Sequence, residues 1–321
     1  MKLSEIKKLM NALPPENMDW QVKKGQELLQ KLGFEPGAMY QELEMESRFV
    51  DTHQDVSFSA TKVNLHSHSF YELLFCRNTC GVEYLVGADR YRLQKGDIIL
   101  IAPGISHCPL LPETMPEPYK RDVLWINAEF MDSVLQYFPE FHLDSPHYSS
   151  LLRTGGTHWE ALGDLFHTGV WEAETKRPGW EMALTGNTLH LLSLLHRAFI
   201  DHSTAPLKAE KPELLDRVLA YVEIHLSEKI TLADVSHLFY VSESTISQTF
   251  RKKLGVSFYR CVTQRRLIAA KALIEEGRIL EQVADLVGFS DYSSFYRAFK
   301  QEYGISPRQY KKLQESPESG L

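Results

Sequence analysis

The 321-residue sequence lacks three features, each of which would mark a different class of protein. No stretch approaches the roughly 18 consecutive apolar residues that a membrane-spanning helix requires. The amino-terminal residues are polar and amphipathic, without the apolar core and cleavage site of a secretory signal. The four cysteines form no Cys-x-x-Cys pair, which argues against zinc ribbons and redox dithiols. We therefore expect a cytoplasmic protein with reduced thiols and no membrane partner.

The sequence also lacks an excess of basic charge, which at first sight disfavours a nucleic-acid ligand, since its net charge is −7. The acidic excess, however, is confined to the amino-terminal part. From Lys211 onward there are 16 basic and 14 acidic residues, whereas the first 210 residues contain 19 basic and 28 acidic ones. Because one face of a domain makes the phosphate contacts, a carboxyl-terminal third with little net charge can still bind DNA.

Periodicity and composition divide the chain into five segments. Residues 1–50 predict a helical extension. Residues 51–200 predict a domain whose first half has short strands separated by turns, typical of a small barrel or sandwich, and whose second half is helical. Residues 201–212 are polar and proline-bearing and predict a linker. Residues 213–312 predict an all-helical domain, and 313–321 a polar tail. The expected fold class is therefore α+β with several domains.

Two stretches of the helical domain repeat each other. Leu232–Ser257 and Leu280–Ser306 each contain a short apolar-periodic helix, a turn and a second helix that ends at a glycine, Gly255 or Gly304. The second helices are shifted by 49 residues. This pattern predicts two helix-turn-helix units, in which a scaffold helix supports a recognition helix for the DNA major groove. A packed helical bundle with no DNA role is the alternative.

In each unit we expect two apolar residues of the recognition helix to pack on two residues of the scaffold helix. These contacts are Ile246 and Phe250 on Val235 and Leu238, and Phe295 and Phe299 on Val283 and Leu286. Between the units, Tyr259–Ile274 lacks Gly and Pro and predicts a rigid helix. That helix would fix the distance between recognition helices, and successive major-groove segments lie roughly 34 Å apart.

The opposite face of each recognition helix is then left for DNA. Gln and Arg can contact adenine and guanine edges, Ser can contact either, and basic residues are placed for backbone phosphates. The predicted DNA-binding residues are Ser244, Ser247, Gln248, Arg251, Lys252, Tyr292, Ser293, Tyr296, Arg297 and Lys300.

Residues 213–312 resemble the DNA-binding domain of AraC/XylS-type transcription regulators, and the second unit carries most of the signature. The matching residues are Val283-Ala284, Gly288-Phe289-Ser290-Asp291, Ser294-Phe295, Arg297, Phe299-Lys300, Gly304, Pro307 and Tyr310, with Arg266, Leu267, Ala270, Leu273 and Ile274 in the connecting helix. The first unit departs from the pattern at Ser236, Ser244 and Ser247, and Lys311 replaces a common Arg. We therefore expect the second unit to read bases more directly than the first.

Two motifs in the β-rich segment resemble those of cupins, NLHSHSFYELLF and PGISH. If the first is one strand, His66, His68 and Glu72 share a parity and point to one face. In metal-binding cupins three His and one Glu converge on a divalent ion inside a jelly roll. Here the spacing after Glu72 departs from that motif, and sensor domains of these regulators commonly keep the pattern without a metal. We therefore expect no cofactor and a small organic effector, with a bound metal as the alternative. The predicted effector residues are His66, His68, Glu72, Tyr84, His107 and Trp125.

The resemblance implies a sequence-specific regulator of transcription, controlled by an effector in the cupin-like domain, and not an enzyme. Its expected partners are operator or promoter DNA, the effector, RNA polymerase and a second copy of the chain. In this architecture helices after the barrel often form the dimer contact, and Leu184, Leu191 and Leu195 suit a two-helix seam. The alternative function is a metal-dependent cupin enzyme or metal sensor fused to a DNA-binding domain.

Overall fold

The computed structural model describes residues 45, 47–58, 63, 65–139, 141, 151–201 and 212–315. Apart from their edges, the predicted extension and linker lie outside these residues, as does most of the predicted tail. The described residues belong to two compact units. From here on, 'first unit' and 'second unit' mean these compact units, and the repeated stretches are called helix-turn-helix units. The first contains Ser47–Ile224 and Thr231–Phe258, and the second contains His225–Ile230 and the chain from Tyr259 onward. The fold class is α+β, as expected, because β-strands dominate the first part of the chain and helices its carboxyl-terminal part.

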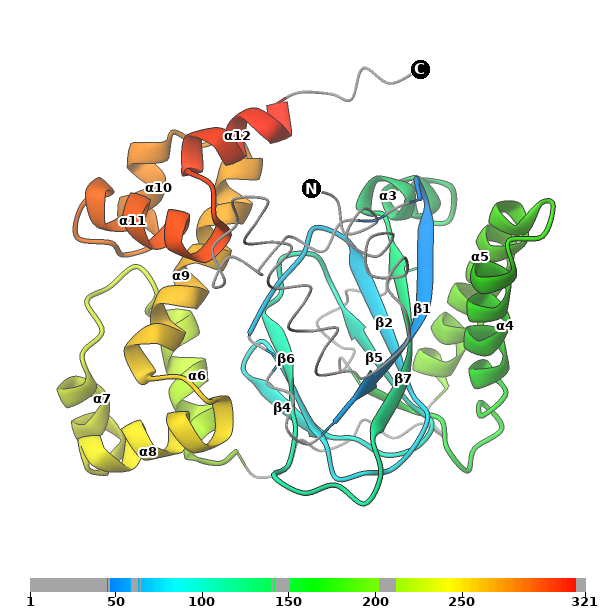
Figure 1. The fold of residues 1–321 in the computed structure, drawn as a ribbon, viewed down its shortest axis with the longest axis horizontal. Coiled ribbons are helices and arrows are strands. Elements are labelled where there is room, and N and C mark those ends of the chain that lie inside the picture. Colours follow the sequence, from blue (N-terminus) through cyan, green and yellow to red (C-terminus); the bar gives the residue numbers. More distant parts are fainter. Residues whose placement is uncertain are drawn as a thin grey trace, which may run out of the picture. The chain divides into compact units, whose positions relative to one another are not determined.

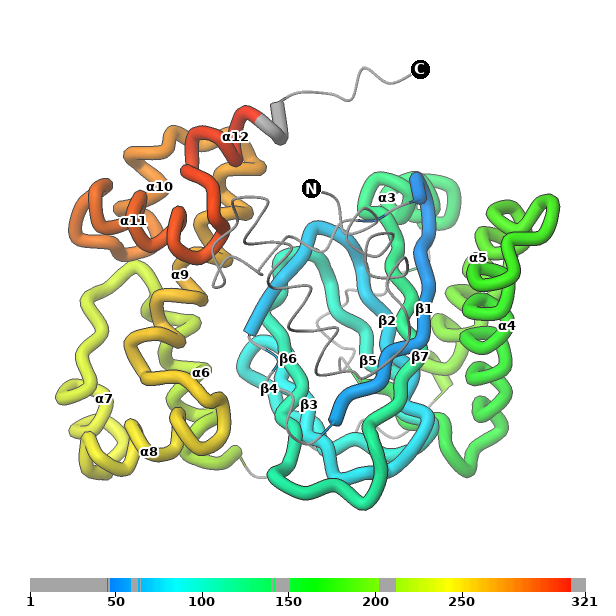
Figure 2. The backbone as a smooth tube through the Cα atoms, in the orientation of Figure 1, coloured from blue at the N-terminus to red at the C-terminus, as the bar shows by residue number. Residues whose placement is uncertain are grey.

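In the first unit the described strands form two antiparallel sheets (Figures 1 and 2). One sheet has five strands in the order β1-β7-β2-β5-β8, and the other has three in the order β4-β3-β6. The strands are β1 (Val50–Ser57), β2 (Tyr71–Cys76), β3 (Glu83–Val86), β4 (Asp89–Arg92), β5 (Asp97–Ile101), β6 (His107–Leu110), β7 (Tyr119–Ile126) and β8 (Leu151–Arg153).

Side-chain alternation along β2 and β7 separates an apolar face from a polar one. Leu73 of β2 lies opposite Leu124 of β7, and both belong to the apolar core. The neighbouring pair, Glu72 and Trp125, points to the other face, where the side chains of the two sheets meet. The two sheets together are called the barrel below, and the space between them is its interior. The register of β2 against β7 therefore determines which polar groups enter this interior.

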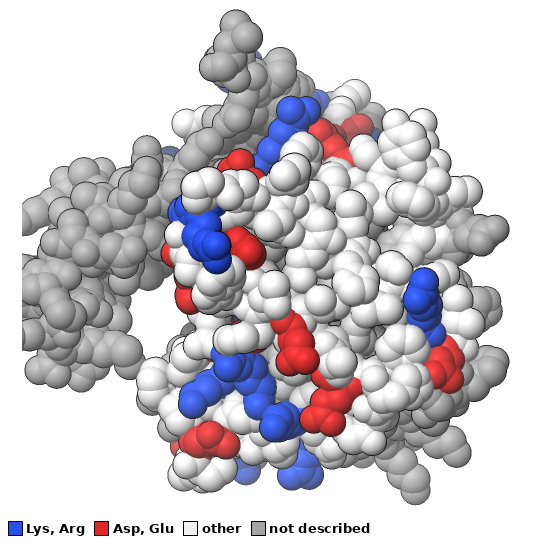
Figure 3. All heavy atoms as spheres, turned by 90° about the vertical axis from the view of Figure 1, so that its right-hand side faces the viewer, with Lys and Arg blue, Asp and Glu red and all other residues white. Residues whose placement is uncertain are grey.

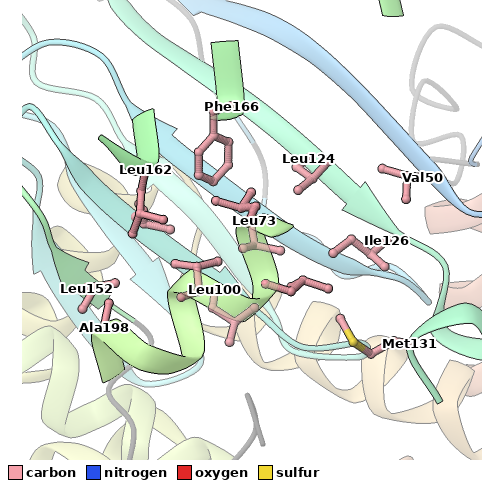
Figure 4. Packing of buried hydrophobic residues seen from close by; sticks show 14 of the residues in the cluster. Val50, Leu73, Leu100, Leu124, Ile126, Met131, Leu152, Leu162, Phe166 and Ala198 are labelled. Carbon is pink, nitrogen blue, oxygen red and sulfur yellow. The ribbon is translucent and has the colours of Figure 1, made fainter. Parts of the chain in front are cut away.

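Three helices accompany the five-stranded sheet, namely α3 (Ala128–Tyr137), α4 (Leu162–Thr175) and α5 (Trp180–Ile200). Helices α4 and α5 cover the outer face of the sheet (Figure 1). Figure 4 shows their contact, in which Leu162 and Phe166 of α4 face Leu73 and Leu124 of the sheet. Each buried side chain of this size contributes roughly 1.5–3 kcal/mol.

The predicted leucine seam on α5 is wrong. Leu184, Leu191 and Leu195 are each only 1% exposed and belong to the core between α5, α4 and the sheet of their own chain. An apolar stripe at helical spacing specifies a face that must be buried, and here the chain's own sheet buries it. These leucines are therefore unavailable to a second copy.

The remaining helices form the repeated part of the chain. The first unit contains α6 (Leu214–Ile224), α7 (Leu232–Phe239) and α8 (Glu243–Leu254), and it includes Phe258, the first residue of α9 (Phe258–Glu275). The rest of α9 lies in the second unit with α10 (Leu280–Leu286), α11 (Tyr292–Tyr303) and α12 (Pro307–Glu315). The connecting helix predicted over 259–274 thus corresponds to α9. Within the described part of the chain, no helix combines the length and the apolar character that crossing a bilayer demands.

Candidate functional site

Both predicted recognition helices begin at a side-chain cap and end at a glycine with positive φ. Ser242 Oγ accepts a hydrogen bond from Thr245 N at 3.1 Å before α8, and Asp291 Oδ1 accepts one from Ser294 N at 2.7 Å before α11. Each helix has 12 residues, so every position of α8 has a counterpart 49 residues later in α11. The φ angles of the final glycines, 71° and 74°, confirm the predicted helix ends.

The inner faces of α8 and α11 carry the predicted aromatic anchors. Phe250 is 1% exposed, and Phe295 and Phe299 are fully buried, as is Ile246. Of the scaffold residues, Val235 and Val283 are also fully buried, as expected. The prediction was wrong for Leu238 and Leu286, which are 50% and 52% exposed. The inward positions of these short helices follow i, i+3, i+4 and i+7 spacing, which runs 232, 235, 236, 239 and 280, 283, 284, 287, and both leucines fall outside it.

The outer faces of α8 and α11 present the predicted DNA-binding residues to solvent. Among these residues only Ser247 and Tyr292 are half-buried, and Tyr292 lies against the ring of Phe295 at 5.9 Å between centroids. Gln248 and Arg297 occupy equivalent positions on the two helices. The exposed residues of the set are Ser244, Gln248, Arg251, Lys252, Ser293, Tyr296, Arg297 and Lys300.

Arg266 of α9 holds the turn between α10 and α11 against the segment 225–230. Its Nε donates to the Leu226 carbonyl at 3.0 Å and its Nη2 donates to the Glu228 carbonyl at 2.6 Å. The same guanidinium lies over the Phe289 ring, and burial lowers the pKa of Arg266. Gly288 occupies the turn with a φ of 85°. The sequence signature includes Arg266 and Gly288, and the structure gives both a role in supporting α11.

The predicted effector residues of the barrel lie close together, but not because they share one strand, as was predicted. His66, His68 and Glu72 do not share one strand, because β2 begins at Tyr71. His66 forms an isolated bridge with His107, and the chain then bends at residues 69 and 70. The bend, rather than strand parity, brings the His68 ring to the same place as Glu72.

Three side-chain atoms converge in the barrel interior. Glu72 Oε2 lies 3.2 Å from His107 Nε2 and 3.5 Å from His68 Nε2. The other carboxylate oxygen, Oε1, accepts a hydrogen bond from Trp125 Nε1 at 2.8 Å. The Tyr84 ring lies nearly parallel to that of His107, with centroids 6.4 Å apart. These five residues are at most 5% exposed, so they form a buried polar cluster.

Burial and mutual contact set the protonation of this cluster. Burial lowers the pKa of His68 despite the neighbouring carboxylate. Burial alone would raise the pKa of Glu72, but the rings of His107 and His68 outweigh burial and hold its pKa well below its usual range. Burial raises the pKa of Tyr84 well above its usual range. At neutral pH the barrel interior therefore contains a carboxylate beside a neutral imidazole and a neutral phenol.

Sequence reasoning missed two further residues that face the barrel interior, Tyr119 and Arg121. The Arg121 guanidinium lies over the Tyr119 ring at 5.0 Å and donates to Ser57 Oγ at 2.9 Å. The fully buried Tyr119 hydroxyl has no hydrogen-bond partner among the described residues. Both residues share the parity of Trp125 on β7, and this parity was the sequence signal that could have found them.

Sequence reasoning also missed a charged contact between the β3–β4 hairpin and α6, both in the first unit. Arg90 Nε and Nη2 donate to the two carboxylate oxygens of Asp216 at 3.0 and 3.1 Å. Arg90 also lies 2.7 Å from Glu83 Oε2 and 3.0 Å from Glu213 Oε1. Lys253, near the end of α8, lies 3.7 Å from Glu83 and 3.6 Å from Glu213. The barrel, α6 and α8 thus share one ionic network.

Comparison with known proteins identifies the repeated helices. A family model described as a helix-turn-helix domain matches residues 235–313. The probable transcriptional regulator LumQ of Photobacterium leiognathi is 40% identical over 104 residues, which cover 32% of this chain and 42% of LumQ. The uncharacterized HTH-type transcriptional regulator YfiF of Bacillus subtilis is 27% identical over 266 residues, which cover 78% of this chain and 79% of YfiF. The match to LumQ thus spans less than half of that relative.

Among solved structures, the chain is similar to the C-terminal domain of AraT, a response regulator from Geobacillus stearothermophilus. That similarity has 28% sequence identity and a TM-score of 0.31, and it covers 34% of this chain and 91% of the AraT domain.

Proposed function

We propose that this chain is an AraC-type transcription regulator, and that a small molecule bound inside the barrel controls its binding to operator DNA. The observation that carries the proposal is the repeat of α8 in α11 after 49 residues, which gives two supported helices with matching exposed faces. The relatives are named as regulators, so the alternative of an enzyme fused to this domain is not proposed. The proposal includes a cytoplasmic location, because the chain would act on DNA.

Equivalent positions on the two helices give each a specific role. Arg297 on α11 contacts a guanine edge with its two-pronged guanidinium, and Gln248 on α8 contacts an adenine edge. Arg251 and Lys300, which are also equivalent, neutralise phosphates and fix the register without reading sequence. Ser244 and Ser247 have short side chains, so α8 reads fewer bases directly than α11 does.

The buried cluster of the barrel supports a binding site for the effector. Ligand sites combine apolar and aromatic walls with a few converging polar groups, and Tyr84 and Trp125 supply the first while His68, Glu72 and His107 supply the second. The unsatisfied Tyr119 hydroxyl extends the set of polar groups available to a ligand. His66 contacts the cluster through His107, since their ring centroids are 4.2 Å apart.

The ionic network between barrel and helices supports the coupling of effector to DNA. An effector changes DNA affinity only if it binds two states of the protein with different affinity. Residues on the β3–β4 hairpin touch α6 and α8 directly, through Arg90 and Glu83. In this proposal the effector shifts the hairpin, and the network transmits the shift to the first recognition helix.

The proposal includes a homodimer that uses the exposed face of α5 instead of its buried leucines. No charged residue lies between Glu181 and Arg197. Met182 is 80% and Leu189 37% exposed on this helix, and a side chain added at Gly186 would meet open space. On this side of the molecule, uncharged residues lie between separate groups of Lys, Arg, Asp and Glu among the described residues (Figure 3). Helix pairs approach closely where small residues line the contact, so a second copy fits this face.

Selection of bound fragments from a genomic library, with the full chain at low salt, tests the DNA part of the proposal. We expect a shared sequence among the selected fragments, and an absence of any selected sequence contradicts the proposal. Compounds are then screened by thermal shift and by their effect on the selected DNA. A genuine effector changes DNA affinity of the wild type and loses that effect in Glu72→Gln, whereas an unchanged effect in Glu72→Gln contradicts the barrel site.

A further inference from the structure

The turn between α7 and α8 contains a strained tyrosine (Figure 1). Tyr240 adopts a left-handed backbone conformation, with φ 55° and ψ 42°, which favours glycine over any residue that carries a Cβ. The tyrosine side chain is at the same time 95% exposed to solvent. The chain thus places an unfavourable residue at a position where its ring gains almost no burial.

The corresponding turn of the second helix-turn-helix unit has a glycine at the same position. In each turn the residue with positive φ donates its backbone N–H to the carbonyl three residues earlier, and the next residue donates to the carbonyl five residues earlier. Tyr240 holds this position in the first turn, and Gly288, with a φ of 85°, holds it in the second. Glycine is the usual residue at this kind of helix end. A glycine at position 240 would serve the fold at least as well, so stability does not explain the tyrosine.

Contacts within the chain do not explain Tyr240 either. Among the described residues, the other one with positive φ that is not glycine is Lys176. Its ammonium lies over the Trp180 ring at 5.5 Å, so an attractive contact accompanies the strain at that position. The Tyr240 side chain has no hydrogen bond and no ring contact with any residue that the structure describes. Strain that no internal contact offsets is typical of positions that serve a function.

The place of Tyr240 in the turn identifies its partner. It lies two residues before Ser242, whose side chain caps α8, so its backbone is within roughly 7 Å of the start of the recognition helix. The amino-terminal part of such a helix enters a major groove about 12 Å wide, whose walls are the two phosphate backbones. A long side chain on the preceding turn meets one of these walls, and tyrosine is among the residues that donate to phosphate oxygens.

We propose that the Tyr240 hydroxyl donates a hydrogen bond to a DNA phosphate beside the bases that α8 reads. This contact rests on the proposed function, because it requires α8 to lie in the major groove. The basic residues of α8, Arg251, Lys252 and Lys253, all belong to its last turn, whereas its first turn contains the acidic Glu243. The hydroxyl therefore supplies a phosphate contact at the end of α8 that has no cation of its own. Held at both ends, α8 keeps its orientation in the groove although its short serines read few bases.

Fluorescence anisotropy with the selected DNA measures this contact in the full chain. Asn and Gly accept a left-handed conformation, so Tyr240→Asn and Tyr240→Gly should melt at the wild-type temperature or above it. Both should nevertheless bind specific DNA about three- to tenfold more weakly. Tyr240→Phe keeps the ring and the strain but lacks the hydroxyl, and should lose the same affinity. Tyr137→Phe removes the hydroxyl of a 79% exposed tyrosine on α3 and should bind like the wild type.

The salt dependence of binding separates this contact from an ionic one. A neutral hydroxyl releases no counterion, so the Tyr240 variants should keep the wild-type salt slope, unlike a variant that loses a lysine contact. A reduced slope in Tyr240→Phe would contradict a hydroxyl contact. A melting temperature of Tyr240→Gly below that of the wild type would show that the ring stabilises the fold, and would remove the reason for the proposal.

Wild-type affinity of Tyr240→Phe or of Tyr240→Gly for the selected DNA overturns the phosphate contact. A Tyr240→Gly variant that binds DNA normally but no longer regulates a reporter gene would assign the turn to a protein partner instead. Equal specific binding by wild type and all Tyr240 variants removes this contact alone. If the wild type itself selects no DNA sequence, the proposed function fails.

Discussion

Arg90 on β4 donates two hydrogen bonds to the carboxylate of Asp216 on α6, from Nε at 3.0 Å and from Nη2 at 3.1 Å. Both side chains are buried, at 8% and 7% exposure. Burial alone would lower the pKa of Arg90, but its hydrogen bonds with Asp216 and Glu83 outweigh burial and raise that pKa. The pair joins the barrel to α6, the helix that precedes the first helix-turn-helix unit, and so connects the sheets and the helices of the first compact unit.

Replacing Arg90 by Met should destabilise the first unit. The substitution leaves the buried Asp216 carboxylate without its cation, and breaking a buried pair in this way typically costs about 3–5 kcal/mol. Urea unfolding measures the change. Arg92→Met, two residues along the same strand but exposed, is the matched control and should stay within about 0.5 kcal/mol of wild type. Equal stability of the two variants would show that the pair contributes nothing.

Glu213 should make the stability of this contact pH-dependent. Burial opposes the change, but Arg90 and Lys253 lower the pKa of Glu213 below its ordinary value. A carboxylate whose pKa is lowered by folding stabilises the folded state at pH values above its unfolded pKa. This contribution to stability is lost as the pH falls through the folded pKa. Wild type should therefore exceed Glu213→Gln in stability at pH 7 and not below about pH 4. High salt should shrink the difference, because Glu213 is half exposed. A difference that persists at low pH contradicts this assignment.

Arg297→Ala should weaken binding to selected DNA by about 1–3 kcal/mol and relax specificity at one base pair. Lys300→Ala, one turn away on the same helix, should weaken all sequences alike and lower the salt slope by about one. Fluorescence anisotropy at several salt concentrations separates the two effects. Arg92→Ala removes an exposed positive charge from the barrel and serves as control. Arg297 has no role in reading bases if its loss affects specific and random DNA equally.

Gly288→Ala should destabilise the second unit more than Gly277→Ala does. Both glycines have nearly the same positive φ, 85° and 83°, and this strain costs roughly 1–2 kcal/mol for an alanine. A Cβ at Gly288 would also lie 2.3 Å from the Leu226 carbonyl oxygen, whereas one at Gly277 would meet open space. Thermal unfolding should show the added steric cost at Gly288 alone. Identical losses at both positions would mean that Leu226 moves aside freely.

Leu189→Arg should dissociate the proposed dimer, since it places a charge in the middle of the uncharged face of α5. We expect at least a tenfold rise in the dimer dissociation constant by sedimentation velocity. Gln136→Arg, exposed on α3, adds the same charge elsewhere and should leave the dimer intact. If both variants sediment like the wild type, the α5 face is not the dimer contact.

The repeated helices were predictable because their determinants are local. The spacing of Ile246 and Phe250, and of Phe295 and Phe299, defines one face of a helix within two turns of chain. Ser242 and Asp291 cap the helices from one residue before them, and Gly255 and Gly304 end them. The exposed set that includes Gln248 and Arg297 then follows from what remains on each helix. The prediction that Leu238 and Leu286 pack inward was wrong because it relied on their apolar side chains, although neither lies at an inward position of its helix.

The barrel site was predictable only in its residue types. The two motifs contained His66, His68, Glu72 and His107, but the argument that put His66, His68 and Glu72 on one strand was wrong, because β2 begins at Tyr71. A bend before β2 and the pairing of β2 with β7 bring the side chains of the cluster together, and neither is coded by a local period. Tyr119 and Arg121 were overlooked for the same reason, although the parity of Trp125 would have pointed to them.

The sequence by itself determined the two helix-turn-helix units, their caps and their exposed faces, because hydrogen bonds and periodicity within a few residues specify them. The tertiary structure alone decided three other matters. It buried the leucines of α5 against their own sheet, it brought three side-chain atoms of the barrel around one point, and it joined Arg90 to Asp216 across 126 positions of sequence. An apolar stripe or a charged residue in the sequence specifies only the kind of partner that is needed. The packing of distant segments decides which residue becomes that partner.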